Sequence, residues 1–200
     1  MKLSLPTKKG TPNSNPEIDF KQLVVIGANG SGKTRLGAKI EEDNHLITHR
    51  ISAQKSLSIP ELIRPKSLDV AKTEFFIGSN HSNQQVNQNW DFKKRNRWGD
   101  NLSTFLLNDF EKLLVLLHTE EYETLTDSKE KKILSPKTNI DKVKEIWEKV
   151  LPHRKLKIKA GTIFTYPTGQ EANSYNASEM SDGERVIFYL VGEVVCAPQN

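Results

Sequence analysis

Gly27-Ala28-Asn29-Gly30-Ser31-Gly32-Lys33-Thr34 is the stretch on which the interpretation of this sequence depends. It follows the pattern Gly-x-x-x-x-Gly-Lys-Thr, in which glycines let the backbone curl until successive amides point into one concavity. An apolar run at residues 23–26 precedes it and predicts a buried strand, and residues 33–42 predict a helix. A strand, a glycine loop and a helix in this order are typical of a phosphate-binding site.

The glycine loop (residues 27–34) is therefore expected to bind a nucleoside triphosphate. Its backbone amides and the start of the following helix would surround the phosphates, because both present unpaired N–H groups to an anion. Lys33 would reach the β- and γ-phosphates, and the Thr34 hydroxyl would be a ligand of Mg²⁺.

Composition sets broad limits on the protein. Its 200 residues suit one domain, or one domain with a small insertion. The apolar runs are much shorter than a membrane span, and the first residues lack the apolar core of a secretory signal, so no membrane partner is expected. The single cysteine, Cys196, predicts a buried thiol in a reducing cytoplasm. A net charge of +4 permits contact with nucleic acid without requiring it.

Hydrophobic periodicity predicts the remaining elements. The expected elements are strands at 20–26, 45–52 and 74–77, helices at 100–123, 139–151 and 183–195, and a β-hairpin of residues 155–160 and 162–166 around Gly161. Apart from the short strand at 74–77, residues 55–99 are expected to be polar and irregular, and residues 126–138 to be charged and exposed.

A second motif, Met180-Ser181-Asp182-Gly183-Glu184-Arg185, precedes the last predicted helix. On its own it reads as an N-cap, in which Ser181 or Asp182 accepts the first helical amides. With a glycine loop upstream, the segment resembles the signature motif of ABC-type ATPases, usually Leu-Ser-Gly-Gly-Gln. Here Met180 stands for Leu, Asp182 for the first Gly and Glu184 for Gln.

The resemblance implies further roles. In such ATPases the signature segment (residues 180–184 here) closes over the γ-phosphate of ATP held by a second subunit, which assigns nucleotide contacts to Ser181, Asp182, Gly183 and Glu184. Gln54 matches the glutamine that contacts Mg²⁺ and the attacking water, and the alternative is an ordinary polar loop residue. Lys33 and Gln54 would then be the catalytic residues, and Thr34 and Gln54 the metal ligands.

The chain resembles the RecF, SMC and OLD group of ABC-type AAA ATPases. This resemblance rests on residues 24–34, 49–54 and 177–185. Within that group they are similar to ATPases of bacterial anti-phage defence systems that work with a Toprim-like nuclease (PARIS-type or retron-associated). The resemblance implies an α/β P-loop NTPase fold with a mostly parallel, ABC-ATPase-like core sheet. It also implies head-to-tail homo-oligomers, ATP and Mg²⁺ as cofactors, and a nuclease effector.

The same resemblance divides the chain into a Walker A and Q-loop lobe (1–54), an inserted, mainly helical arm (55–154), and β segments with the signature helix (155–200). No apolar strand ending in Asp-Glu, the Walker B pattern, is found, and neither are the D-loop and switch histidine. We therefore expect the N-terminal part of a longer ATPase, with little hydrolysis by this piece alone.

Other functions remain open at this point. A DNA-repair ATPase of the RecF/SMC kind, a transporter subunit, and a nucleotide-gated scaffold without turnover are the alternatives, of which the transporter fits least. Residues 90–98 interleave aromatic and basic side chains, which is typical of nucleic-acid binding, but a charged loop with Trp90 and Trp98 packed inward explains them better. The five histidines form no convincing zinc-ligand set.

Overall fold

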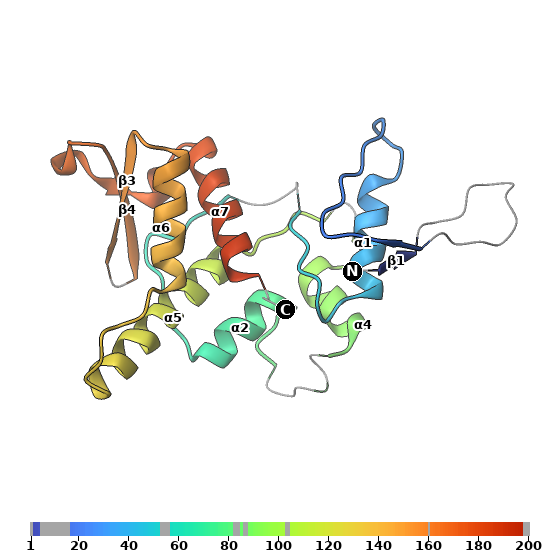
Figure 1. Cartoon of the computed structure of the whole chain (residues 1–200), viewed down its shortest axis with the longest axis horizontal. Helices are drawn as coiled ribbons and strands as arrows, with labels where there is room; N and C mark the ends of the chain where they lie inside the picture. Colours follow the sequence, from blue (N-terminus) through green and yellow to red (C-terminus); the bar gives the residue numbers. More distant parts are fainter. Residues whose placement is uncertain are drawn as a thin grey trace, which may run out of the picture. The chain divides into compact units, whose positions relative to one another are not determined.

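The structure is a computed structural model that describes residues 2–4, 17–52, 57–81, 85, 88–102, 105–159 and 161–197. Its contacts divide the chain into two compact units, Met1–Arg50 and Ile51–Asn200. Figure 1 shows the helices and strands of both units. Among the described residues, none of the helices combines the length and the apolar character needed to cross a membrane.

The first unit contains a short ribbon and one helix. Strands β1 (Lys2–Ser4) and β2 (Glu17–Asp19) pair antiparallel, with Leu3 opposite Ile18. Helix α1 (Lys33–Asp43) follows the glycine loop, as predicted. The Arg50 guanidinium forms an ion pair of 2.8 Å with the fully buried carboxylate of Glu41, so the segment after α1 is tied to the helix.

The predictions of strands at 20–26 and 45–52, on either side of the glycine loop and α1, are wrong. Residues 22–28 have no regular structure, and Val24 and Ile26 are 81% and 91% exposed. Residues 45–52 form a turn and an irregular segment. A strand buried on both faces depends on neighbouring strands for its hydrogen bonds and on layers above and below for its side chains. The described part of this unit pairs no strand with residues 23–26, so the apolar run remains exposed.

The second unit is mainly helical. Its elements are α2 (Leu68–Ile77), α4 (Trp90–Lys93), the π-helix η1 (Lys94–Trp98), α5 (Phe110–Glu130), α6 (Asn139–Val150), β3 (Arg154–Lys159), β4 (Thr162–Pro167), η2 (Glu171–Asn173), β5 (Tyr175–Asn176), η3 (Ala177–Glu179) and α7 (Asp182–Cys196). The strands form an antiparallel sheet in the order β3-β4-β5. Helix α6 packs against α7, and both contact α5 (Figure 1).

One apolar core holds the helices and the sheet of this unit together. Phe110, Leu113 and Leu117 of α5 are fully buried, and Trp147 of α6 and Tyr189 of α7 are equally enclosed. Helices α5 and α7 approach closely at Gly192, where an added Cβ would lie 2.7 Å from Leu113 Cδ2. The predicted arm and the signature helix therefore share one core. Cys196 is buried as predicted, and this burial raises the pKa of its thiol.

The structure confirms the helices predicted at 139–151 and 183–195 and the hairpin around Gly161. The prediction of a strand at 74–77 is wrong, because these residues form the end of the longer helix α2, which closes at Gly78. The helix predicted from residue 100 begins only at Phe110, and it continues into the charged stretch as far as Glu130. Both sheets are antiparallel, and the described strands include no parallel pair, so the parallel core sheet stays a prediction.

Candidate functional site

The glycine loop turns sharply before α1. Gly30 and Gly32 have φ values of 79° and 89°, a left-handed conformation that side chains other than glycine adopt with strain. The Ser31 amide donates a hydrogen bond of 3.2 Å to the Ala28 carbonyl, and this bond closes the turn. The loop is thus curled, as the sequence predicts, although the strand expected before it is absent.

The Lys33 side chain folds back over this turn. Its ammonium group donates hydrogen bonds of 2.7 Å to the Gly27 carbonyl and 2.8 Å to the Ala28 carbonyl. A cation is therefore held at the mouth of the curled loop. The carbonyl oxygens that accept these hydrogen bonds carry only a partial negative charge. An anionic phosphate oxygen would be a stronger acceptor for the same N–H donors.

The helix start beside the lysine is open. The N-cap residue of α1 is Gly32, which has no side chain to accept the first helical amides, and the first turn contains no acidic residue. Unpaired amides at the positive end of a helix favour an anion. Gly27 is exposed, and a Cβ added there would lie 2.6 Å from Ser31 Oγ, so a larger residue would have to displace the Ser31 side chain. The loop residues thus fit a phosphate chain, and the exposed Thr34 lies in the first turn, where its hydroxyl can serve a bound Mg²⁺.

The other predicted residues of this site are less defined. Gln54 lies outside the described residues. Among the residues that the structure describes, no three His, Cys, Asp or Glu side chains gather as metal ligands. The metal roles of Thr34 and Gln54 and the catalytic role of Gln54 therefore stay predictions.

The signature segment lies at the start of α7, in the second unit. Ser181 is the N-cap, and it forms a capping box with Glu184. The Ser181 amide and hydroxyl donate hydrogen bonds of 2.9 Å and 2.8 Å to Glu184 Oε2. Met180 is buried, whereas Asp182 and Gly183 are exposed, and a Cβ added to Gly183 would meet no atom within 4 Å.

Glu184 also has partners on the neighbouring sheet. Its Oε1 atom forms an ion pair of 2.9 Å with Arg154 of β3 and accepts a hydrogen bond of 3.2 Å from the Tyr175 hydroxyl of β5. Burial alone would raise the pKa of Glu184, but the hydrogen bonds from Ser181 and the charge of Arg154 outweigh it and lower the pKa below its ordinary value. The carboxylate therefore stays ionised at neutral pH.

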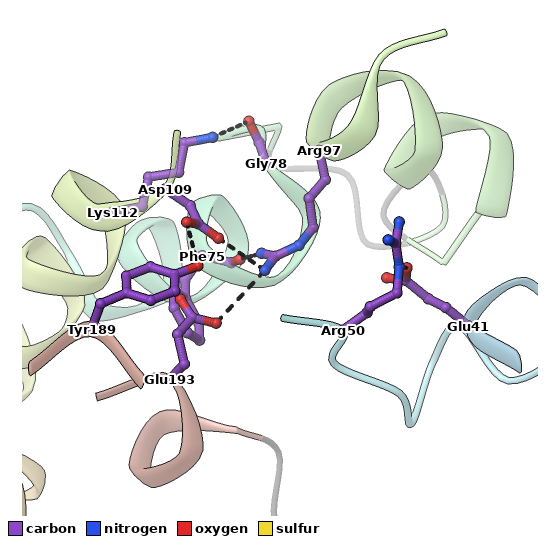
Figure 2. A network of polar contacts seen from close by, with 9 residues as sticks. All are labelled: Glu41, Arg50, Phe75, Gly78, Arg97, Asp109, Lys112, Tyr189 and Glu193. Carbon is purple, nitrogen blue, oxygen red and sulfur yellow. Dashed lines mark hydrogen bonds and ion pairs between the residues drawn. The ribbon is translucent and has the colours of Figure 1, made fainter. Parts of the chain in front are cut away.

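The basic and aromatic residues at 90–98 do not form an exposed nucleic-acid surface. Trp98, Arg97 and Lys93 are buried, and only part of the segment faces solvent. Figure 2 shows the Arg97 guanidinium donating to the Phe75 carbonyl and to Asp109, at 3.0 Å, with Glu193 of α7 close by. This network also includes the Tyr189 hydroxyl, which donates to Asp109 at 2.7 Å.

Sequence reasoning missed several of these contacts. The capping box itself has a sequence pattern, because Ser181 is followed three residues later by Glu184. The roles of Arg154 and Tyr175 left no local signal, because Arg154 lies 30 positions before Glu184 and reaches it only through the fold. Comparison with protein-family models, with curated proteins and with solved structures found no match for the chain.

Proposed function

We propose that this chain binds ATP together with Mg²⁺ through the glycine loop, as the nucleotide-binding part of an ABC-type ATPase. The observation that carries the proposal is the Lys33 ammonium, which lies within 2.8 Å of two carbonyls of a curled loop. The uncapped start of α1 directly after that loop supports it. Lys33 would bind the β- and γ-phosphates, and Thr34 and Gln54 would hold the metal ion.

Hydrolysis is proposed to take place between copies arranged head to tail. The exposed Gly183 leaves room for a phosphate to approach the start of α7, so Ser181 and Gly183 of one copy would complete the site of the next. Control of an effector, a nuclease in anti-phage defence, rests on the resemblance of the motifs. The lone buried Cys196 fits a protein of the reducing cytoplasm.

A DNA-repair ATPase has less support. Residues 90–98, whose composition is typical of nucleic-acid binding, contribute Arg97 and Trp98 to the protein core, where neither can contact a nucleic-acid backbone. A nucleotide-gated scaffold that does not hydrolyse ATP uses the same loop, so ATP binding is the step to test first.

The test is a calorimetric titration of the chain with ATP and Mg²⁺. Lys33→Ala removes the charge-assisted contacts to the phosphates and is expected to weaken binding on the order of a hundredfold. Lys39→Ala is the matched control, because Lys39 is an exposed lysine of the same helix that pairs with Glu42 and Asp43. Equal affinity of the Lys33 variant and the wild type would refute the proposal.

A further inference from the structure

We propose that the outward face of the β3-β4-β5 sheet binds a single-stranded polynucleotide, whose bases stack on two aromatic rings of β4 while lysines of β3 contact its phosphates. The inference goes beyond the proposed function, because it uses neither the glycine loop nor ATP. It also involves none of the residues at 90–98.

The first step is that the register of the sheet collects basic and aromatic side chains on one face. Leu156 of β3 and both Ile163 and Thr165 of β4 are buried, so these strands turn one face to the core. Side chains alternate between the two faces of a strand, and directly opposite residues of an antiparallel pair share a face. The outward face therefore carries three cross-strand pairs: Lys155 with Tyr166, Lys157 with Phe164, and Lys159 with Thr162.

The second step is that the two rings on this face are accessible. Phe164 and Tyr166 are half-buried, although they lie in the same strand as the buried Ile163 and Thr165. The ammonium of the exposed Lys159 lies 5.6 Å from the centroid of the Phe164 ring. This ring thus presents a face to a solvent-exposed side chain, and a base can take that position. Stacking of bases on aromatic side chains tolerates any base, because every base has a π-face.

The third step is that the spacing of the rings selects a single strand. Phe164 and Tyr166 are two residues apart, which separates them by about 7 Å along β4. In a duplex, successive phosphates of one strand follow each other about every 3.4 Å along the axis, and the bases are stacked on one another. Two neighbouring bases can occupy the two rings only when they are pulled apart, as they are in an unpaired strand.

The fourth step is that the charge of this face is complementary to phosphate. Lys157 pairs with Glu171 of η2 at 3.3 Å, and the two side chains are 43% and 64% exposed. An ion pair so open to water contributes little stability, so a phosphate can replace Glu171 as the partner of Lys157. When a base stacks on Phe164, the Lys159 ammonium leaves the ring and becomes available to the adjoining phosphate.

The remaining lysine of this face is assigned no phosphate contact. Lys155 forms an ion pair of 2.8 Å with Glu148 of α6, which also accepts a hydrogen bond from the Leu156 amide. Glu148 is therefore fixed at the edge of β3 and neutralises Lys155.

The experiment titrates the full chain, without ATP, into a fluorescently labelled oligothymidine of about 12 nucleotides, a length that such surfaces cover. Fluorescence anisotropy reports binding, and the titration is repeated at several salt concentrations. An abasic oligonucleotide and a duplex of the same length are the reference probes. We expect the oligothymidine to bind about tenfold more tightly than the abasic strand, because only the former can stack. The duplex is also expected to bind more weakly than the oligothymidine.

Variants of Phe164 test the stacking. Phe164→Leu keeps an apolar side chain but removes the ring, and it is expected to weaken binding of the oligothymidine about tenfold. Phe164→Trp provides a larger ring and is expected to retain the affinity. Tyr122→Leu is the matched control, because Tyr122 is an exposed aromatic residue of α5, and it is expected to change nothing. Thermal unfolding of each variant verifies that the chain is folded.

A lysine variant tests the phosphate contacts. Lys159→Gln is expected to reduce the slope of log affinity against log salt concentration by about 0.7, whereas Phe164→Leu leaves this slope unchanged. Lys129→Gln removes the same charge from an exposed position of α5 and is expected to leave the slope as in the wild type.

Several outcomes would overturn the proposal. Equal affinity for the oligothymidine and the abasic strand would mean that charge alone attracts the strand, as would equal effects of Lys159→Gln and Lys129→Gln. Tighter binding of the duplex, or a loss of affinity with Phe164→Trp as large as with Phe164→Leu, would refute stacking on β4. Absence of binding by the wild type would refute this inference and leave the proposed ATP site unaffected.

Discussion

Helices α1 and α7 both begin beside a glycine, but only α7 has a side chain that accepts a hydrogen bond from its first backbone amides. At α1 the N-cap is Gly32, which provides no side-chain acceptor, and the Lys33 ammonium lies against the carbonyls of the preceding loop. At α7 the N-cap is Ser181, and the Glu184 carboxylate closes the capping box. One helix end is left positive and open, and the other is neutralised from within the chain.

This difference bears on binding, because an open helix end attracts an external anion and a capped one must first release its own. Under the proposed function, the first end would hold the phosphates of a bound nucleotide, and the second would contact a phosphate only when copies assemble. Substitutions that act on one end and spare the other can break or sharpen this contrast.

The largest effect is expected from a bulky residue at Gly27. A Cβ at this position would lie 2.6 Å from Ser31 Oγ and 4.0 Å from Lys33 Cδ, so the larger side chain of Gly27→Val displaces the Ser31 hydroxyl and crowds the Lys33 side chain. We expect ATP affinity to fall by about fiftyfold or more in a calorimetric titration.

The matched substitution at the other helix end is Gly183→Ala, where an added Cβ meets no atom within 4 Å. This variant is expected to keep the affinity of a single copy for ATP, because the glycine loop of that copy is unchanged, and to gain about 0.5 kcal/mol of folding stability because alanine favours a helix over glycine. A loss of affinity with Gly183→Ala similar to that with Gly27→Val would remove the distinction between the two ends.

The features that sequence reasoning predicted correctly are those set by residues close together in the chain. The turn of the glycine loop follows from Gly30 and Gly32, and α6 and α7 follow from apolar residues spaced one turn apart. The Ser181 cap needs only a partner three residues away. Each of these features is formed by local contacts, so a single sequence contains the information.

The features it missed depend on distant partners. The apolar run at 23–26 has the composition of a buried strand, but composition does not supply the strands that would bury it. Residues 90–98 were interpreted as a charged loop, and nothing nearby in the sequence indicates that Asp109 and Glu193 would pair with Arg97 in the core. A window of four residues at 74–77 was too short to reveal the helical period of α2.

A smaller effect is expected when the cap itself is removed. Ser181→Ala leaves the first amides of α7 without their acceptor and is expected to lower the free energy of unfolding by about 1 kcal/mol, measured by urea denaturation. Thr138→Ala is the matched variant at α6, and it is expected to cost a similar amount. Because α6 has no proposed nucleotide contact, only Ser181→Ala should also reduce ATP-dependent association, and equal association of the two variants would argue against the role of α7.

The smallest effect concerns the pH dependence of stability at Glu184. Hydrogen bonds from Ser181 and the charge of Arg154 outweigh desolvation and lower the pKa of this carboxyl below its ordinary value of 4.5. The folded state therefore favours the ionised form. This contribution is present above the unfolded pKa and is lost as the pH falls through the folded pKa. Glu184→Gln cannot titrate, so the difference in Tm between wild type and variant should narrow by about 1–2 °C from pH 7 to pH 3.

Gly183→Ala is the control for this measurement, because it changes the same helical turn without altering a charge, and its Tm difference from the wild type should stay constant over the same range. A Tm difference for Glu184→Gln that is also independent of pH would mean that folding does not favour the ionised carboxylate. The ionised carboxylate at the start of α7 would then stabilise the folded state no more than a carboxylate exposed to water. In that case α7 would differ from α1 only in the shape of its first turn.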